Sequence, residues 1–280
     1  MKIIDAHAHP RFSTPWESAT AIRQGNWELE EIIRQAGLAG IEQMIVLGNI
    51  LRFGVNPDAS QVRLINEETA ELVERHPDFF VGYCYLNPLL SKEEIEQEAL
   101  TFLRDGNFVA IKLEVDCCAS DPRMGPLMEI AEMLDVPVLQ HAWDTKNRPL
   151  IASPKEGMQQ TDGQDVAILA KRHPRVRIQM AHLTGVGQIG VLAVRDCENV
   201  WVDTSGAQPV AGMTEYALQQ LGEDRVIYGS DFPIRDLAGS LAKVYSAVPP
   251  GPVREKVFAR NWESMIDGRP NSGGAPRAPS

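Results

Sequence analysis

The chain opens with IIDAHAHPRF (residues 3–12), an apolar run that leads into two histidines one residue apart. In a β-strand, side chains two positions apart point to the same face. His7 and His9 are therefore expected side by side at the carboxyl end of a first strand. One interpretation is a polar strand end. The other is a metal-binding pair, because chelation requires two imidazoles on one face.

Short apolar runs of the same kind recur along the chain, rich in Val, Ile and aromatic residues, as is typical of buried parallel strands. The predicted strands are residues 2–8, 43–49, 79–87, 108–115, 136–143, 176–183, 200–206 and 225–232. Amphipathic stretches lie between them and several end in Gly or His-Pro. The predicted helices are residues 26–40, 66–77, 91–107, 126–135, 163–174, 213–222 and 240–248, with a weaker candidate at 187–199.

Eight strands that alternate with helices predict an α/β protein with a (β/α)₈ TIM barrel; a doubly wound open sheet is the structural alternative. Polar residues at the strand ends favour the barrel. We expect one catalytic domain over residues 1–266 and a Gly-, Pro- and Ser-rich tail at 267–280 that lies outside the fold. Residues 10–25 form a long loop after the first strand, expected to cover the barrel mouth.

Composition narrows the class of partner. The chain has 280 residues, is 44% hydrophobic and carries a net charge of −11, which argues against nucleic acid or an anionic membrane as the main partner. Its four cysteines form no C-x-x-C pair, and no apolar run is long enough to span a membrane. We therefore expect a cytoplasmic protein that acts on a small molecule, and a homodimer is compatible with this architecture.

In a barrel, the carboxyl ends of the strands form the catalytic face, so polar residues at those ends are candidates for chemistry. They are His7, His9, Lys112, Glu114, His141, His182, Asp203 and Asp231. Imidazoles and carboxylates on separate strands are typical of an open catalytic site for zinc, manganese, iron or nickel. Such an ion activates a bound water and polarises a substrate oxygen.

Several candidates also have a purely structural interpretation. Asp203 and Asp231 could cap loops, and Lys112 could simply form a buried ion pair with Glu114. Trp143 shares a face with His141 and could line a substrate pocket or pack in the core.

Two arginines follow strand ends. Arg235 is a candidate for holding a substrate carboxylate, whereas Arg123 is assigned to the surface.

Four motifs together resemble the amidohydrolase superfamily over about residues 2–266. They are DAHAH at the first strand, QHAW at the fifth, MAHLTG at the sixth and YGSDFP at the eighth. The branch most similar to this chain contains aminocarboxymuconate-semialdehyde decarboxylase, other nonoxidative decarboxylases, lactone hydrolases and many uncharacterised hydrolases. The resemblance implies that His7, His9, His141 and Asp231 are metal ligands, and that Asp231 handles the proton of an attacking water.

The resemblance leaves the metal count open. His182 is then a second-metal ligand or a group that polarises the substrate. Lys112, when carboxylated, or Glu114 could bridge two ions. Asp5, deeper on the same face, is expected to orient one imidazole from behind.

From these features we predict a metal-dependent hydrolase of an amide, lactone or other ester, with one or two ions, zinc foremost. Asp231 and His182 are its predicted catalytic residues, with Trp143 and Arg235 at the substrate. The alternative is a metal-dependent nonoxidative decarboxylase of a small carboxylic acid, since the same ligands serve both reactions. A non-catalytic metal-binding barrel is the third interpretation.

Overall fold

A computed structural model of the chain describes residues 1–10, 29–50, 52–144, 157–206 and 210–267. Its centre is one eight-stranded parallel sheet in which consecutive strands are neighbours, so the predicted (β/α)₈ barrel is confirmed. The strands are Ile4–Ala8 (β1), Gln43–Val46 (β2), Phe80–Tyr85 (β3), Phe108–Leu113 (β4), Val138–Gln140 (β5), Ile178–Met180 (β6), Val200–Asp203 (β7) and Val226–Ile227 (β8).

The sheet closes between its last and first strands. The backbone N–H of Ala6 donates to the carbonyl of Tyr228 at 3.1 Å. Further along, Ala8 and Phe232 form a parallel bridge. This closure rules out the open-sheet alternative and brings the residues after β8 next to those of β1.

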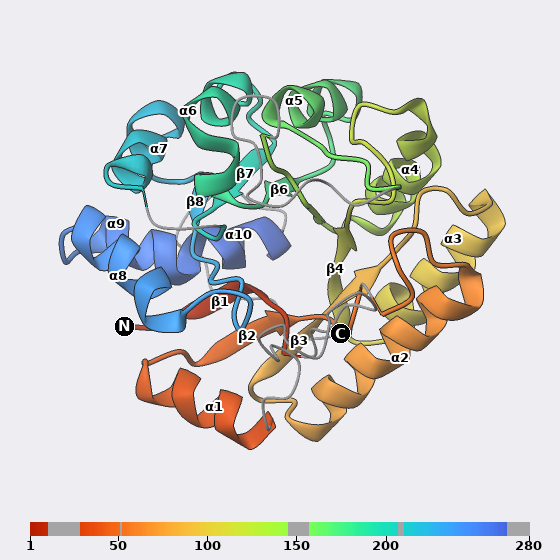
Figure 1. Cartoon of the computed structure of the whole chain (residues 1–280), viewed down its shortest axis with the longest axis horizontal. Helices are drawn as coiled ribbons and strands as arrows, with labels where there is room; N and C mark the ends of the chain where they lie inside the picture. Colours follow the sequence, from red (N-terminus) through yellow and green to blue (C-terminus); the bar gives the residue numbers. More distant parts are fainter. Residues whose placement is uncertain (11–28, 51, 145–156, 207–209, 268–280) are drawn as a thin grey trace.

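Helices surround the strands as an outer ring (Figure 1). They are Leu29–Leu38 (α1), Ala59–Arg75 (α2), Lys92–Ala99 (α3), Gly125–Leu134 (α4), Gly163–Arg172 (α5), Leu183–Ala193 (α6), Met213–Leu221 (α7), Leu237–Ala247 (α8), Pro252–Glu255 (α9) and Asn261–Asp267 (α10). Short π-helical turns at Leu100–Arg104 (η1) and Lys256–Arg260 (η3), and a 3₁₀ turn at Pro122–Met124 (η2), join some of them.

Local sequence sets where several helices begin. Asp58, Ser91 and Asp162 each accept a hydrogen bond from the backbone N–H three residues later, whose side chain bonds back to the cap. These capping boxes satisfy donors that the helix itself leaves unpaired. The box at Asp58 explains why α2 starts at Ala59, seven residues before the predicted start.

Apolar residues alternate between two layers along the strands. In β2, Met44 and Val46 pack in the cluster that joins the sheet to the helices, while Ile45 belongs to a second cluster with Tyr83 and Ala110. The strand residues of the second cluster face the barrel interior, as expected for a packed (β/α)₈ core. The barrel is therefore solid below its mouth, and chemistry is confined to the carboxyl ends of the strands.

Three predictions fall partly or wholly outside the described residues: most of the loop at 10–25, the first residues of the helix at 26–40 and nearly all of the tail at 267–280. The domain boundary at residue 266 stays a prediction. Among the described residues, none of the helices combines the length and the apolar character that a membrane crossing needs.

Candidate metal centre

The two histidines of the opening motif converge at the barrel mouth. His7 lies in β1 and His9 follows it, and their Nε2 atoms are 3.1 Å apart. Asp231, just after β8, places Oδ1 3.4 Å from His9 Nε2. All three residues are buried. The prediction that His7 and His9 share one face is confirmed, and a carboxylate joins them.

Two residues of the mouth adopt a backbone conformation that is uncommon without glycine. His182 (φ 67°) and Asp231 (φ 63°) are both left-handed. This conformation is rare for residues other than glycine and costs about 1–3 kcal/mol. It therefore persists only where the surrounding structure holds the backbone in place. Here each directs a polar side chain into the mouth, directly after β6 and β8.

The donor atoms at the mouth fit a divalent cation. One ligand atom each from His7, His182 and Asp231 lie within 4.8 Å of one another. Imidazole nitrogen and carboxylate oxygen suit zinc and the other divalent transition metals. His141 stands beside this group, with Nδ1 3.3 Å from His182 Nε2.

The strand-4 pair lies at the edge of the centre rather than within it. Lys112 is fully buried, and its Nζ is 2.6 Å from Glu114 Oε1. The other carboxylate oxygen of Glu114 is 3.6 Å from His141 Nδ1. The ion pair that sequence left as an alternative is thus present, and Glu114 lines the mouth beside His141.

Asp5 has partners other than the predicted imidazole. Its carboxylate accepts from the backbone N–H of Ser230 at 2.9 Å, from the Ser230 hydroxyl at 2.5 Å and from the backbone N–H of His7 at 3.3 Å. Asp5 therefore secures the backbone that leads into Asp231. The imidazole of His7 is oriented by Asp203 instead, whose Oδ2 is 3.0 Å from His7 Nδ1.

Sequence reasoning underestimated Asp203 and did not consider Ser205. Asp203 ends β7 fully buried, and the Ser205 hydroxyl bonds both to it and, at 2.9 Å, to His182 Nδ1. Position at a strand end was the available signal for Asp203. Nothing local distinguishes Ser205 from an ordinary loop serine.

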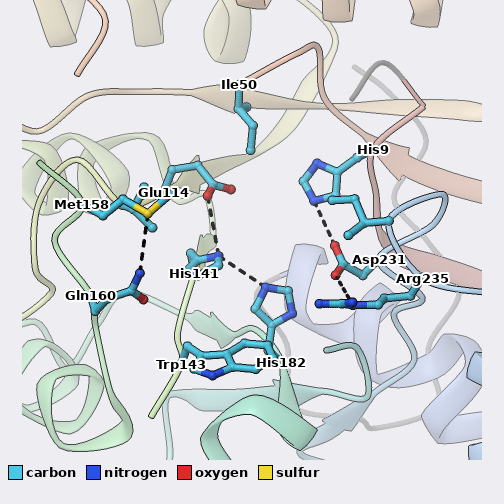
Figure 2. Close-up of a pocket in the computed structure, with 12 residues that line it drawn as sticks. His9, Ile50, Glu114, His141, Trp143, Met158, Gln160, His182, Asp231 and Arg235 are labelled. Carbon is cyan, nitrogen blue, oxygen red and sulfur yellow. Dashed lines mark hydrogen bonds and ion pairs between the residues drawn. The ribbon is translucent and has the colours of Figure 1, made fainter. Parts of the chain in front are cut away.

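The mouth opens into a cavity of about 750 Å³, part of which is open to solvent. Figure 2 shows Trp143 beside His182, and the guanidinium of Arg235 directed toward the mouth. The cavity is lined by His9, Ile50, Glu114, Val115, His141, Trp143, Met158, Gln160, His182, Asp231, Ile234 and Arg235. Arg123 instead pairs with Asp121 and has a side chain 60% exposed, as its surface assignment predicted.

A glycine makes room for the aromatic wall. A Cβ on Gly185 of α6 would lie 2.5 Å from Trp143 Cε3, closer than real Cβ contacts. The Trp143 ring centroid is 5.9 Å from that of His182. Trp143 therefore packs against both Gly185 and His182, a residue of the candidate metal centre.

Burial and neighbouring charge set the ionisation of the site. Burial lowers the pKa of His141 to about 4 and also lowers the pKa of His9 and His182. Burial opposes ionisation of Asp203, but the charge and hydrogen bond of His7, with bonds from Ser205 and Gln179, bring its pKa to about 2. These three neutral imidazoles and an ionised carboxylate behind them suit cation binding.

The fold and these residues agree with a comparison against protein families. A model described as Amidohydrolase matches residues 4–262, nearly the whole chain. The chain belongs to the amidohydrolase family. The resemblance inferred from the four motifs is thereby confirmed. Among curated proteins, none matches this amidohydrolase.

Solved structures share the fold of this amidohydrolase across almost its full length. A 2,6-dihydroxybenzoate decarboxylase complexed with 2,6-dihydroxybenzoate is 19% identical, with a TM-score of 0.75, over 94% of this chain and 98% of its own. The 5-carboxyvanillate decarboxylase of Sphingomonas paucimobilis is 17% identical, with a TM-score of 0.71, over 95% and 98%. A dihydroxybenzoic acid decarboxylase from Polaromonas sp. JS666, with bound manganese and 2-nitroresorcinol, is 17% identical, with a TM-score of 0.74, over 94% and 96%.

Proposed function

We propose that this amidohydrolase is a divalent-metal-dependent, nonoxidative decarboxylase of a small planar carboxylic acid. The observation that carries the proposal is the buried group of His7, His9 and Asp231, which opens into a cavity with an aromatic wall and one guanidinium. The similar folds named as decarboxylases favour this reaction over the hydrolysis predicted first. The acids in their names are planar and aromatic, and a wall formed by Trp143 fits such a ring.

The proposed ligands are His7, His9, His141 and Asp231, with a single ion. A second ion beside Glu114 would compete with the Lys112 ammonium, which already neutralises that carboxylate at 2.6 Å. Manganese is present in one similar fold, whereas imidazole-rich ligands also suit zinc. We therefore propose Mn²⁺ or Zn²⁺ as the ion.

When bound, a divalent cation would neutralise negative charge on the substrate and hold it at the mouth. Arg235 is placed to pair with the carboxylate, because its guanidinium lines the cavity 3.6 Å from Asp231 Oδ2. Trp143 packs against the ring and excludes water from one face.

The reaction itself needs only one proton from the protein. The bond between the substrate carbon and its carboxylate breaks, carbon dioxide leaves, and the electron pair stays on the carbon. Asp231, which lines the cavity, is placed to relay a proton from solvent to that carbon. The products are the decarboxylated compound and carbon dioxide, and no oxidant or reductant takes part.

The test is a substrate panel on the purified full-length chain, stripped with a chelator and reloaded with Mn²⁺ or Zn²⁺. Hydroxylated benzoic acids should release carbon dioxide with the reloaded protein and not with the stripped one. Cleavage of lactones, esters or amides without carbon dioxide release would instead support a hydrolase. Retention of a bound ion together with inactivity on both panels would support the non-catalytic metal-binding barrel.

A further inference from the structure

Asp203 is the convergence point of hydrogen bonds at the base of the mouth. Its Oδ2 lies 3.0 Å from His7 Nδ1 and accepts from Gln179 Nε2 at 2.8 Å. Its Oδ1 accepts from the backbone N–H groups of His182 and Ser205 at 3.1 and 3.0 Å, and lies in short contact with the Ser205 hydroxyl. N–H donors reach both oxygens and favour the ionised carboxylate, and an ionised Asp203 is an acceptor only.

This fixes the direction of the bond to Ser205. A hydroxyl has one hydrogen and two lone pairs, and the hydrogen must point at the unprotonated Asp203. The Ser205 oxygen therefore accepts from its other neighbours. These are the backbone N–H of His182 at 3.2 Å, the Nδ1 of His182 at 2.9 Å and, more distantly, the Nδ1 of His7 at 3.3 Å.

An acceptor opposite Nδ1 dictates which ring nitrogen of a neutral histidine carries the proton. Because Ser205 accepts, His182 must carry its proton on Nδ1. Because Asp203 accepts, His7 must do the same. Both rings then present an unprotonated Nε2 to the mouth.

We propose that Asp203 and Ser205 are positioning residues that hold His7 and His182 in the Nδ1-protonated form, so that His182 Nε2 is an acceptor toward the cavity. Ser205 transmits the effect of Asp203 to His182, the residue that the sequence left as a metal ligand or as a group polarising the substrate. An Nε2 lone pair can accept a proton or bind a cation. It cannot donate a hydrogen bond to a substrate oxygen.

The same constraint reaches a third ring. His141 Nδ1 faces His182 Nε2 at 3.3 Å and Glu114 Oε2 at 3.6 Å. Both of these atoms are acceptors, so His141 also carries its proton on Nδ1, which in the metal-free protein donates to the lone pair of His182 Nε2, and it keeps its own Nε2 for a metal. One buried carboxylate thus orders imidazoles from three strands. This inference rests on the proposed metal site but not on decarboxylation.

The test is long-range ¹H–¹⁵N correlation of histidine rings in the full-length, metal-free chain, with the His182 signals assigned from a His182→Asn spectrum. The wild-type protein should show His182 protonated at Nδ1. Ser205→Ala removes the acceptor, so His182 should shift toward the Nε2-protonated form while His7 stays unchanged. Wild-type His182 protonated at Nε2, or a His182 signal that Ser205→Ala does not move, would overturn the proposal.

Two further variants separate this role from simple packing. Thr204→Val removes a neighbouring buried hydroxyl, which bonds to the backbone of Gly229, and should leave both rings unchanged. Asp203→Asn cannot accept all of the donors, so it should move His7 or His182 and lower Zn²⁺ affinity about 10- to 100-fold. Unchanged tautomers and affinity in a folded Asp203→Asn protein would contradict the proposal. If the Asp203→Asn protein does not fold, the Ser205→Ala spectrum still tests the proposal. The proposal concerns the ring tautomers, so a loss of decarboxylation by itself does not contradict it.

Discussion

Lys112 Nζ lies 2.6 Å from Glu114 Oε1, and both side chains are buried inside the barrel. Burial alone would raise the pKa of Glu114, but the charges of Lys112 and His141 bring that pKa to about 2. The pair places a fixed positive charge beside the site that sequence had proposed for a second metal. Two variants of this pair distinguish an ion pair from a metal bridge.

Lys112→Met should destabilise the metal-free protein by about 3–5 kcal/mol, because it leaves a buried carboxylate without its partner. Lys112→Met combined with Glu114→Gln should recover much of that loss. Urea unfolding of both proteins measures the difference. A single variant as stable as the wild type, or a double variant as unstable as the single, would contradict the ion-pair assignment.

His9→Ala should abolish both metal retention and activity while the barrel stays folded. Its Nε2 lies 3.1 Å from His7 Nε2 and 3.4 Å from Asp231 Oδ1, so its loss opens the donor group. Metal analysis after gel filtration, with circular dichroism as the check on folding, measures the effect. His173→Ala, at the end of α5, is the matched control and should retain the metal. A fully active His9→Ala protein would defeat the ligand assignment.

Arg235→Ala should raise KM for an anionic substrate about tenfold, with a smaller effect on kcat. A charged hydrogen bond contributes about 1.5–3 kcal/mol. Because the Arg235 side chain is 41% exposed, solvent screens its charge, and we expect a contribution at the lower end of that range. Steady-state kinetics of the reloaded protein gives both constants. Arg123→Ala removes an exposed arginine paired with Asp121 and should leave KM unchanged. Equal KM values in the two variants would exclude Arg235 from substrate binding.

Gly185→Ala should displace the Trp143 indole, since the new Cβ would lie 2.5 Å from Cε3. We expect a loss of about 1–3 kcal/mol in stability, which is typical of overpacking, and a raised KM. In a Trp143→Ala background the same change should cost little, because the clashing ring is gone. A double-mutant cycle on unfolding free energy measures this coupling. Additive effects would mean that the two residues do not interact.

Asp116 should give the metal-free protein a component of stability that falls as pH rises. Burial raises the pKa of Asp116 to about 7, although the Tyr85 hydroxyl donates to Oδ1 at 2.5 Å. The ordinary pKa of an aspartate is near 4, so the folded state binds the extra proton between about pH 4 and 7. Stability from this group is therefore complete below pH 4 and lost as pH rises toward 7.

The Asp116→Asn variant isolates that component, because asparagine does not titrate. Its unfolding free energy minus that of the wild type should increase from pH 5 to pH 8, because only the wild type loses this stability. Urea unfolding at several pH values measures the difference between the two proteins. A constant difference over that range would contradict a raised pKa at Asp116.

Element type and order could be predicted from the sequence because they depend on local patterns. Apolar runs predicted all eight strands, and spacing placed His7 and His9 on one face. The predicted ends of the elements were less accurate. For example, β8 spans only Val226–Ile227 within the predicted 225–232. Helical residues at 252–267 were not predicted, since short helices and π-helical turns there carry weak periodicity.

What the sequence by itself determined is the set of residues that reaches the barrel mouth, because parallel strands bring their carboxyl ends to one edge. Which of them touch was decided only by closure of the barrel. Closure brings the end of β7 within reach of β1 across the barrel, so Asp203, 196 positions from His7, orients that ring in place of Asp5. It also brings Asp231, which follows β8, within 3.4 Å of His9, which follows β1. Contacts between distant strands depend on register and packing across the whole barrel, and no local pattern encodes them.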